Sequence, residues 1–393
     1  MTVARTADVA VVGLGGLGSA SAYWLARRGA SVIGFDQFEL GHVRGASHDH
    51  SRIIRRSYHT PEYVRLTAHA YDAWRAVEAE SRQRIITITG GIDLFPVDAA
   101  IDHRTYTASL DAEHVPYEWI DGAEVRTRWP AFAQGDIVTD DVMAIYSPQT
   151  GIVPAGQGTR MMQELAAARG AVLHGNMPVR AIRPVGGEVD IVTDEGVTRV
   201  GSVILTADAW SNRVLAELDL RIPLAVTREQ VSYFPHADLA QFGVGRFPVW
   251  IWMDDPSYYG FPMFGDLAGL KGAEDCGGSE VDPDTRTFDP DPAMEATLGT
   301  FMEGLVGGGF GAPRSTTCLY TLTSDRDFVL DRLPGYPQVA IALGAAHGFK
   351  FASWFGRTLA GLACGEPVAP ELAPFSFTRE SLHRPIERAA WMF

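Results

Sequence analysis

Three glycines near the start of the chain are spaced for binding a phosphate-bearing ligand. Gly13, Gly15 and Gly18 follow the apolar run 9–12 without a gap and precede the helical pattern of 19–28. The first glycine permits a tight turn, the second lets the backbone approach a pyrophosphate, and the third lets helix and strand pack closely. The start of the helix adds free N–H groups and a positive partial charge. The spacing therefore predicts a dinucleotide-binding site.

Asp36 stands where a ribose-binding acid is expected. It ends a second apolar strand, 31–35, and lies 18 residues beyond Gly18. A carboxylate at this position accepts hydrogen bonds from a ribose diol and disfavours the 2′-phosphate of NADP. This unit alone does not separate NAD from FAD, so both cofactors remain open at this point.

Nucleotide-domain patterns recur along the chain instead of forming one block. Buried-strand patterns return at 171–173, 203–207 and 339–344, whereas the region 224–320 is strand-like and rich in aromatic residues and proline. The intervening pieces are typical of a separate mixed or antiparallel sheet. Because a nicotinamide dehydrogenase more often has one contiguous nucleotide domain, the interleaving favours a flavoprotein.

Composition excludes several classes of partner. The 393 residues carry 33 basic and 48 acidic side chains, a net charge of −15, which argues against nucleic acid or an anionic membrane. Three cysteines make no disulfide framework, and no apolar stretch reaches the roughly 20 residues of a membrane span. The glycines of 13–18 also interrupt the first apolar run before any secretory cleavage site. We expect a cytoplasmic protein.

Several motifs beyond the glycine turn are shared with one known family. The chain resembles the FAD-dependent amine oxidases of the monomeric sarcosine oxidase and N-methyltryptophan oxidase type, and more distantly the fructosyl-amino acid oxidases. The similarity runs over nearly the whole chain. The motifs that carry it are Ser51-Arg52-Ile53-Ile54-Arg55, Tyr258-Tyr259-Gly260-Phe261-Pro262, Gly269-Leu270-Lys271, Cys318-Leu319-Tyr320-Thr321 and His347-Gly348-Phe349-Lys350-Phe351.

The resemblance implies an α/β fold of two domains. One is a Rossmann-like FAD-binding domain, discontinuous in sequence and assembled from 1–86, 151–222 and 323–393. The other is a substrate domain, 87–150 and 223–322, built on a mixed, mainly antiparallel β-sheet that covers the flavin.

Cys318 matches the cysteine that the family joins through sulfur to the 8α-methyl group of FAD. Covalent attachment needs a thiolate beside the flavin, and basic neighbours favour it by lowering the pKa of the thiol. The alternative is that Cys318 is a buried core cysteine, and this is what we expect for Cys276 and Cys364.

Basic side chains supply the expected catalytic and binding groups. By resemblance, Arg52 lies against the flavin, and Arg55 holds the substrate carboxylate with Lys350 as its partner. A guanidinium binds a carboxylate through two hydrogen bonds, and lysine adds a point charge. Lys271 matches the lysine that promotes the reaction of reduced flavin with oxygen. Surface salt bridges and a strand-edge lysine are the alternatives.

Aromatic, glycine and histidine residues complete the expected site. By resemblance, Tyr259 is an active-site tyrosine and Tyr58 a neighbour in the substrate pocket. His48-Asp49-His50 could suggest a metal, but no third ligand cluster accompanies it, so we expect none. The other residues expected at the cofactor are His48, Tyr320, Gly344, His347, Gly348, Phe349 and Lys350.

One position departs from the sarcosine oxidase pattern. Asp275, four residues beyond Lys271, stands where sarcosine-type members carry a histidine and fructosyl-amino acid oxidases an acid. A carboxylate in the pocket favours a substrate with a hydroxyl or a second cationic group, or it holds the substrate amine. A loop shift around Gly277-Gly278 would instead leave Asp275 outside the pocket. Both arrangements remain open.

The resemblance implies oxidation of a secondary amine or an N-alkyl or cyclic amino acid. The products are an imine, which hydrolyses, and hydrogen peroxide formed from molecular oxygen. A fructosyl-amino acid or another amine is an alternative substrate. The competing functions are an NAD-dependent dehydrogenase, in which Cys318 is structural, and a flavin-bound sensor. We expect a monomer.

Overall fold

The computed structural model describes residues 5–387 and contains a mixed sheet whose central strands are parallel, as in nucleotide-binding folds. The order β10-β11-β12-β1-β2-β9 forms its main path, and β20 joins β12 with β19 at its side. The pairs β1·β12, β1·β2, β2·β9 and β12·β20 are parallel. The strands of this first sheet are β1 (Arg5–Val12), β2 (Val32–Phe35), β9 (Val172–His174), β10 (Val179–Val185), β11 (Glu188–Thr193), β12 (Gly196–Leu205), β19 (Val329–Leu333) and β20 (Tyr336–Leu343).

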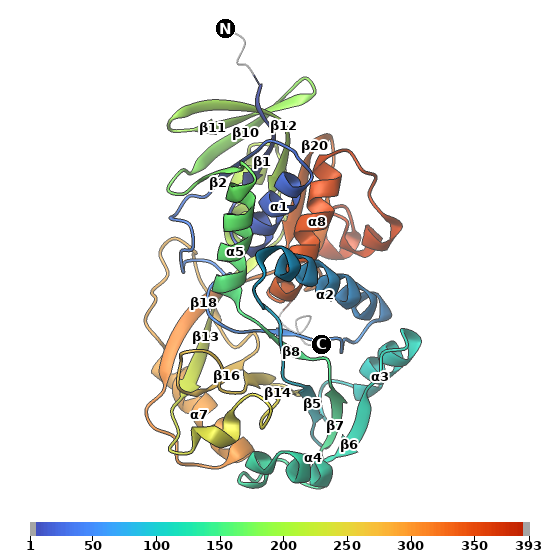
Figure 1. Cartoon of the computed structure of the whole chain (residues 1–393), viewed down its shortest axis with the longest axis vertical. Coiled ribbons are helices and arrows are strands. Elements are labelled where there is room, and N and C mark those ends of the chain that lie inside the picture. The colour runs from blue at the N-terminus through green and yellow to red at the C-terminus, as the bar shows by residue number, and fades with distance from the viewer. Residues whose placement is uncertain (1–4, 388–393) are drawn as a thin grey trace.

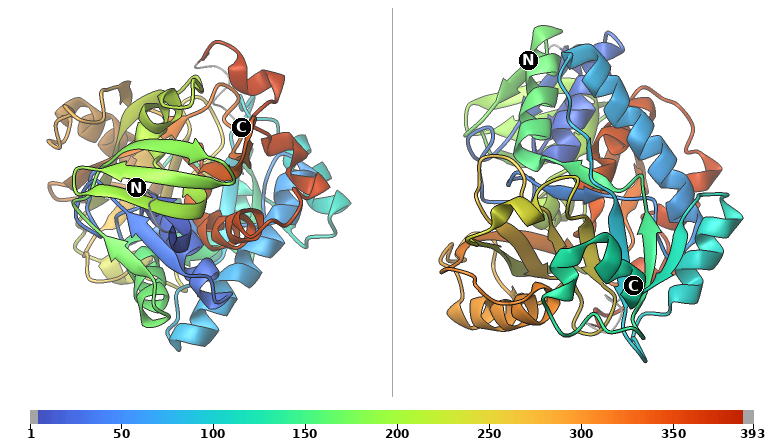
Figure 2. Two further views of the ribbon diagram at one scale, coloured as in Figure 1. Left: turned by 90° about the horizontal axis from the view of Figure 1, so that it is seen from above. Right: turned by 60° about the horizontal axis from the view of Figure 1, so that its bottom comes forward.

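Two layers flank the parallel part of this sheet. Helix α1 (Gly16–Arg27) packs between α5 (Ala155–Ala168) and α8 (Ala352–Ala363), and Figure 1 shows the three side by side. The antiparallel meander of β10, β11 and the first half of β12 forms another layer, seen from above in Figure 2. Val9 and Val11 pack with the helices, whereas Ala10 and Val12 pack toward the meander. A continuous apolar run is buried on both faces for this reason.

A second sheet of nine strands occupies the opposite end of the molecule (Figure 1). Its order is β17-β13-β16-β15-β14-β5-β7-β6, with β18 beside β13, and only β14·β5 is parallel. The predicted fold class, with a mixed and mainly antiparallel second sheet, is confirmed. Its strands are β5 (Gly91–Phe95), β6 (Glu118–Asp121), β7 (Met143–Ser147), β13 (Ala225–Phe234), β14 (Val249–Trp252), β15 (Tyr258–Phe261), β16 (Leu270–Glu274), β17 (Ser279–Glu280) and β18 (Arg314–Leu322).

A small three-stranded sheet lies in the connections between the two large sheets. The small sheet has the order β3-β8-β4, and its strands are β3 (Arg52–Ile54), β4 (Thr87–Ile88) and β8 (Gly151–Val153). The first sheet thus draws its strands from 5–35, 172–205 and 329–343, and the second draws its strands from the chain between these segments. The other helices are α2 (Pro61–Ser81), α3 (His103–Ala112), α4 (Gly122–Arg128), α6 (Ser211–Ala216) and α7 (Pro292–Val306).

Candidate active site

The turn between β1 and α1 leaves no room for side chains. Gly13 has a φ of 90°, and a Cβ atom there would lie 2.5 Å from the backbone oxygen of Thr206. A Cβ atom on Gly18 would collide with the carbonyl oxygen of Gly13, and one on Gly16 would lie 2.7 Å from the ring of Phe349. The turn is therefore held close to its neighbours and presents backbone to the space above it.

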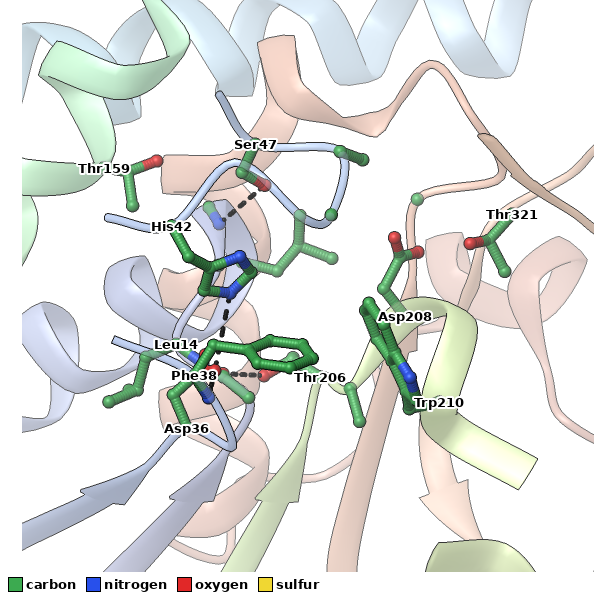
Figure 3. Close-up of a pocket in the computed structure, with 18 of the residues that line it drawn as sticks. Leu14, Asp36, Phe38, His42, Ser47, Thr159, Thr206, Asp208, Trp210 and Thr321 are labelled. Atoms are coloured by element: carbon green, nitrogen blue, oxygen red, sulfur yellow. Dashed lines mark hydrogen bonds and ion pairs between the residues drawn. The ribbon is translucent and has the colours of Figure 1, made fainter. Parts of the chain in front are cut away.

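Asp36 ties the turn to the end of β2. Its Oδ2 atom accepts a hydrogen bond from Leu14 N at 2.8 Å, and its Oδ1 atom accepts one from Phe38 N at 3.0 Å. His42 Nε2 lies 3.4 Å from Oδ1 (Figure 3). The carboxylate that sequence reasoning assigned to a ribose also orders the phosphate turn.

A long cavity opens above the turn. Asp208 and Trp210 stand across it from Leu14 and Asp36 (Figure 3). We call it the first cavity; its lining includes the segments 12–17, 35–38, 45–48, 206–208 and 342–344, together with Arg52, Thr159, Tyr320, Gly348 and Phe349.

The lining of the first cavity fits an FAD. Two side-chain atoms on its wall, His48 Nε2 and Thr159 Oγ1, are buried with no hydrogen-bond partner. Burial, reinforced by the charge of Arg52, lowers the pKa of His48 to about 4, so the imidazole is neutral. Buried polar atoms normally have partners. A polar ligand in this cavity would supply them.

A second cavity adjoins the first. Arg52, Tyr320, Ala346 and Phe349 line both cavities, so a ligand in one lies directly beside a ligand in the other. The full lining of the second cavity is Arg52, Ile53, Arg55, Tyr58, Ile251, Met253, Ser257, Tyr259, Phe261, Asp275, Tyr320, Arg326, Ala346, His347, Phe349 and Lys350.

Arg52 and Arg55 point in different directions from the β3 segment. Arg52 donates to Asp49 Oδ2 at 3.2 Å and to the backbone oxygen of Ala46 at 3.1 Å, at the junction of the two cavities. Arg55 lies 3.4 Å from Asp93 Oδ1, with its guanidinium 4.9 Å from the ring centre of Tyr58. Arg55 is thus anchored with its planar group at the wall of the second cavity.

The ammonium of Lys350 is buried, and few contacts offset the free-energy cost of burying its charge. Its Nζ donates to the backbone oxygen of His347 at 3.0 Å, and among the described residues no carboxylate lies within ion-pair distance. Burial, together with the charge of Arg55, lowers its pKa well below the ordinary lysine value. An anion between Lys350 and Arg55 would offset this cost.

Asp275 lies in the second cavity and is paired there. Its Oδ2 atom accepts a hydrogen bond from Arg326 at 2.6 Å, and its backbone N–H donates to Ser257 at 2.9 Å. Of the two arrangements left open above, the structure has the one with the acid in the pocket. Sequence analysis did not identify Arg326 as a site residue; it lies in the turn between two acids, Asp325 and Asp327.

Tyr259 and Tyr320 meet at the wall of the second cavity, where their hydroxyl oxygens lie 3.2 Å apart. Tyr58 lies across from them, with its hydroxyl 3.5 Å from His347 Nδ1. Burial raises the pKa of Tyr58 to about 12, and it lowers the pKa of His347 far below its usual value. The pocket thus offers neutral hydrogen-bonding groups beside its cations.

Lys271 reaches the junction from β16 and is itself buried. Its Nζ donates to Asp49 Oδ2 at 2.7 Å and to Ser51 Oγ at 2.9 Å. It is not among the described residues that line either cavity. Asp49, considered above only as a metal ligand, is therefore a partner of Lys271 that sequence reasoning missed.

Cys318 is buried on β18, two residues before Tyr320 and on the same face of the strand. Its side chain is not among the described groups that line the first cavity. Burial raises the pKa of the thiol to about 11, although the charges of Arg52 and Lys271 lower it. The expectation of a lowered thiol pKa is therefore wrong for the chain without its cofactor, because desolvation outweighs the basic neighbours.

Gly344, Gly348 and Phe349 line the first cavity, and His347 and Lys350 line the second. Across the described part of the chain, no three histidine, cysteine or acidic side chains gather as a metal ion would require. No helix between residues 5 and 387 is both long and apolar enough to span a bilayer.

Comparisons with known proteins agree with this geometry. Residues 8–362 match the family model described as FAD dependent oxidoreductase. Monomeric sarcosine oxidase of Bacillus sp. (strain NS-129) is 33% identical over 96% of this chain and 98% of its own length. N-methyl-L-tryptophan oxidase of Yersinia pestis (strain Pestoides F) is 28% identical over 95% and 99%.

Solved structures share the fold. NikD, an unusual amino acid oxidase essential for nikkomycin biosynthesis, superposes with a TM-score of 0.84 at 24% identity, covering 95% of this chain and 98% of its own. Glycine oxidase from Geobacillus kaustophilus superposes with a TM-score of 0.80 at 20% identity, covering 96% and 99%. At these identities the superpositions establish the fold alone.

Proposed function

Because the chain belongs to the FAD dependent oxidoreductase family, we propose that it oxidises a secondary amine or an N-alkyl or cyclic amino acid. The amine becomes an imine, which hydrolyses, and molecular oxygen becomes hydrogen peroxide. The observation that carries the proposal is the pair of cations, Arg55 and Lys350, in a cavity that shares a wall with the cavity above the glycine turn.

Arg55 and Lys350 hold the substrate carboxylate. The guanidinium of Arg55 is kept in place by Asp93 and the ring of Tyr58, so it binds the carboxylate with little loss of side-chain freedom. Lys350 adds a charge that has no carboxylate partner of its own among the described residues. Asp275 then accepts a hydrogen bond from the substrate amine, at the wall formed with Arg326.

The cofactor carries the redox step. FAD, when bound in the first cavity, would accept the equivalent of a hydride from the carbon next to nitrogen, and the two electrons would then reduce oxygen to hydrogen peroxide. The chain binds the amine, orients it and excludes bulk water, and the ammonium of Lys271 stabilises negative charge that develops on oxygen. No side chain of the second cavity is required to act as a general base on carbon.

The remaining expectations are part of the same proposal. Cys318 forms the thioether with FAD, favoured by its position on the face of β18 that carries Tyr320. The first sheet with its helices forms the FAD-binding domain (1–86, 151–222 and 323–393), and the second sheet forms the substrate domain. The enzyme is a cytoplasmic monomer.

Hydrogen peroxide release tests the proposal. Purified protein is mixed with a panel of N-methyl amino acids, cyclic amino acids and amines without a carboxylate, and peroxide and imine-derived products are measured. We expect turnover of one or more carboxylate-bearing amines and none with NAD as acceptor. Absence of peroxide with the whole panel, or reduction of NAD, would contradict it.

Covalent attachment has its own test. Wild-type protein precipitated in acid should keep its yellow colour, and Cys318→Ala should release all of it, whereas Cys276→Ala should not. Flavin that washes free of the wild-type protein would refute the link through Cys318 and leave the oxidase proposal standing.

Asp275 and Arg326 also favour a second candidate substrate. An ion pair in the cavity wall can donate to and accept from several hydroxyl groups, so a fructosyl-amino acid belongs in the same panel. Faster oxidation of that substrate than of any N-methyl amino acid would identify it.

A further inference from the structure

Asp49 is the centre of a buried cluster beside the junction of the two cavities. Its carboxylate accepts hydrogen bonds from Lys271 Nζ at 2.7 Å, from the Tyr233 hydroxyl at 2.6 Å and from Arg52 at 3.2 Å. The side chains of Asp49 and Lys271 are 5% and 3% exposed. One carboxylate is therefore shared between two cations in a place that water barely reaches.

The ammonium of Lys271 is fully engaged. Besides Asp49, it donates to the backbone oxygen of Ser51 at 3.0 Å and to Ser51 Oγ at 2.9 Å. An ammonium has three N–H donors, and here each has an acceptor, of which only Asp49 is charged. The ring centre of Phe261 lies 4.6 Å from Nζ. These contacts fix the direction of the side chain.

Several other groups face Lys271. His48 and His50 lie in the loop beside Asp49, Arg52 comes from β3, Tyr233 from β13 and Cys318 from β18. Burial lowers the pKa of Lys271 to about 8; Asp49 opposes this, and Arg52 reinforces it. Burial raises the pKa of Asp49, but Lys271, His50 and Arg52 together outweigh burial and hold that pKa well below its usual value. No other carboxylate is an ion-pair partner of Lys271 within residues 5–387.

We propose that Asp49 is a positioning residue that keeps Lys271 protonated and fixed in place for the reaction with oxygen. The inference rests on the proposed oxidase function. Without the carboxylate, the buried ammonium would retain only the two oxygens of Ser51 beside the like charge of Arg52. Lys271 would then lose its proton near neutral pH.

The backbone at Asp49 makes this inference testable without unfolding the protein. Asp49 has a φ of 81°, in the left-handed region that asparagine tolerates and glycine adopts freely. Asp49→Asn and Asp49→Gly therefore remove the charge while keeping the turn. Asp331→Asn is a matched control. Asp331 lies on β19, where its carboxylate accepts hydrogen bonds from the Ser376 hydroxyl and from Phe377 N, and it lines neither cavity.

The first measurement is the pH profile of reoxidation. The bound flavin is reduced anaerobically by light, mixed with oxygen, and followed by its absorbance. The wild-type rate should fall as the pH rises through about 8, where Lys271 loses its charge. In both Asp49 variants the fall should occur at least one pH unit lower, which means reoxidation slowed about fivefold or more at pH 8 and near wild-type rates at pH 6. Asp331→Asn should match the wild-type profile.

The second measurement does not depend on turnover. The midpoint potential of the bound flavin is measured against pH, and the break that marks deprotonation of Lys271 should move down by at least one unit in Asp49→Asn. The double variant Asp49→Asn/Lys271→Met should reoxidise as Lys271→Met does. The proposal would be overturned if the variants reoxidised more slowly by the same factor at every pH. It would also be overturned if the break in midpoint potential did not move, or if the losses in reoxidation rate were additive in the double variant.

The two proposals fail in different ways. If no amine in the panel yields peroxide, the oxidase function falls, although photoreduced flavin still reports on Lys271. If peroxide forms and the profiles of the Asp49 variants coincide with that of the wild type, only the role of Asp49 falls.

Discussion

The carboxylate of Asp275 accepts a hydrogen bond from Arg326 at 2.6 Å inside the cavity that also holds Lys350. Each arginine of that cavity has such a partner. The pairs are Arg52–Asp49, Arg55–Asp93 and Arg326–Asp275. Lys350 is left as the cation without a carboxylate among the described residues. The pocket therefore matches a substrate with one carboxylate and a neutral amine.

Asp275→Asn should relax this charge requirement. With the acid gone, the guanidinium of Arg326 can attract a second substrate carboxylate, which Asp275 otherwise repels. We expect kcat/KM for N-methylglutamate relative to N-methylglutamine to rise about tenfold or more, as expected for a charge-assisted hydrogen bond. Steady-state oxygen consumption with the two substrates gives the ratio. An unchanged ratio in an active variant would count against the charge match.

Lys350→Met should weaken binding of carboxylate substrates specifically. Losing one charged hydrogen bond of about 1.5–3 kcal/mol raises KM by roughly 10- to 100-fold. Amines without a carboxylate should keep their KM, which serves as the control.

The same lysine gives a pH signature. Because burial lowers the pKa of Lys350, its charge is lost as the pH rises, at a lower pH than for an ordinary lysine. The wild-type KM for a carboxylate substrate should therefore increase with pH, and the KM of Lys350→Met should not. Parallel profiles would contradict the role of Lys350.

Gly18→Ala should abolish cofactor binding or folding. The new methyl group would meet the backbone of Gly13, which cannot yield as a flexible side chain could, so the turn must move. Gly187→Ala is the matched control, since a Cβ atom there has no neighbour within 4 Å. The flavin content and the thermal unfolding temperature are measured for both variants. Equal losses of flavin and of stability in the two variants would refute the prediction.

Glu229→Gln should stabilise the protein at alkaline pH. Glu229 is buried on β13, where it accepts from Thr227 and Gly278, and burial raises its pKa to about 7. A raised carboxyl pKa means that stability is lost as the pH rises from the unfolded value through about 7, by about 3 kcal/mol at most. Glutamine carries no such penalty. The melting temperature of the variant should exceed that of the wild type at pH 8 and approach it at pH 5.

Sequence reasoning reached the parts of the site that depend on local backbone. The spacing of Gly13, Gly15 and Gly18 predicts the turn because the constraint lies within one strand–turn–helix unit. The resemblance added Arg55 and Lys350, which come from the residues just after β3 and from the short helix Gly348–Phe351 before α8.

The residues that sequence reasoning missed act through tertiary contacts. Asp49 and Lys271 are 222 positions apart, and Asp275 and Arg326 are 51 apart. Nothing in the neighbourhood of either acid indicates which cation it meets. The one local signal is at Asp49, an acid between two histidines just before Arg52, and that pattern by itself suggests a metal ligand instead of a partner for a lysine.

The order of the strands has a consequence for how the protein is made. Ala10 of β1 pairs with Val203 of β12, and β12 in turn pairs with β20, which leads into the loop of Gly344. Chains leave the ribosome at about 5–20 residues per second, so the N-terminal strand waits roughly 10–40 s for β12. The glycine turn is synthesised first, but it cannot bind a flavin until residues 342–349, which complete the first cavity, have been synthesised. Cofactor capture is therefore a closing event of biosynthesis, and nascent chains stalled before residue 344 should be colourless.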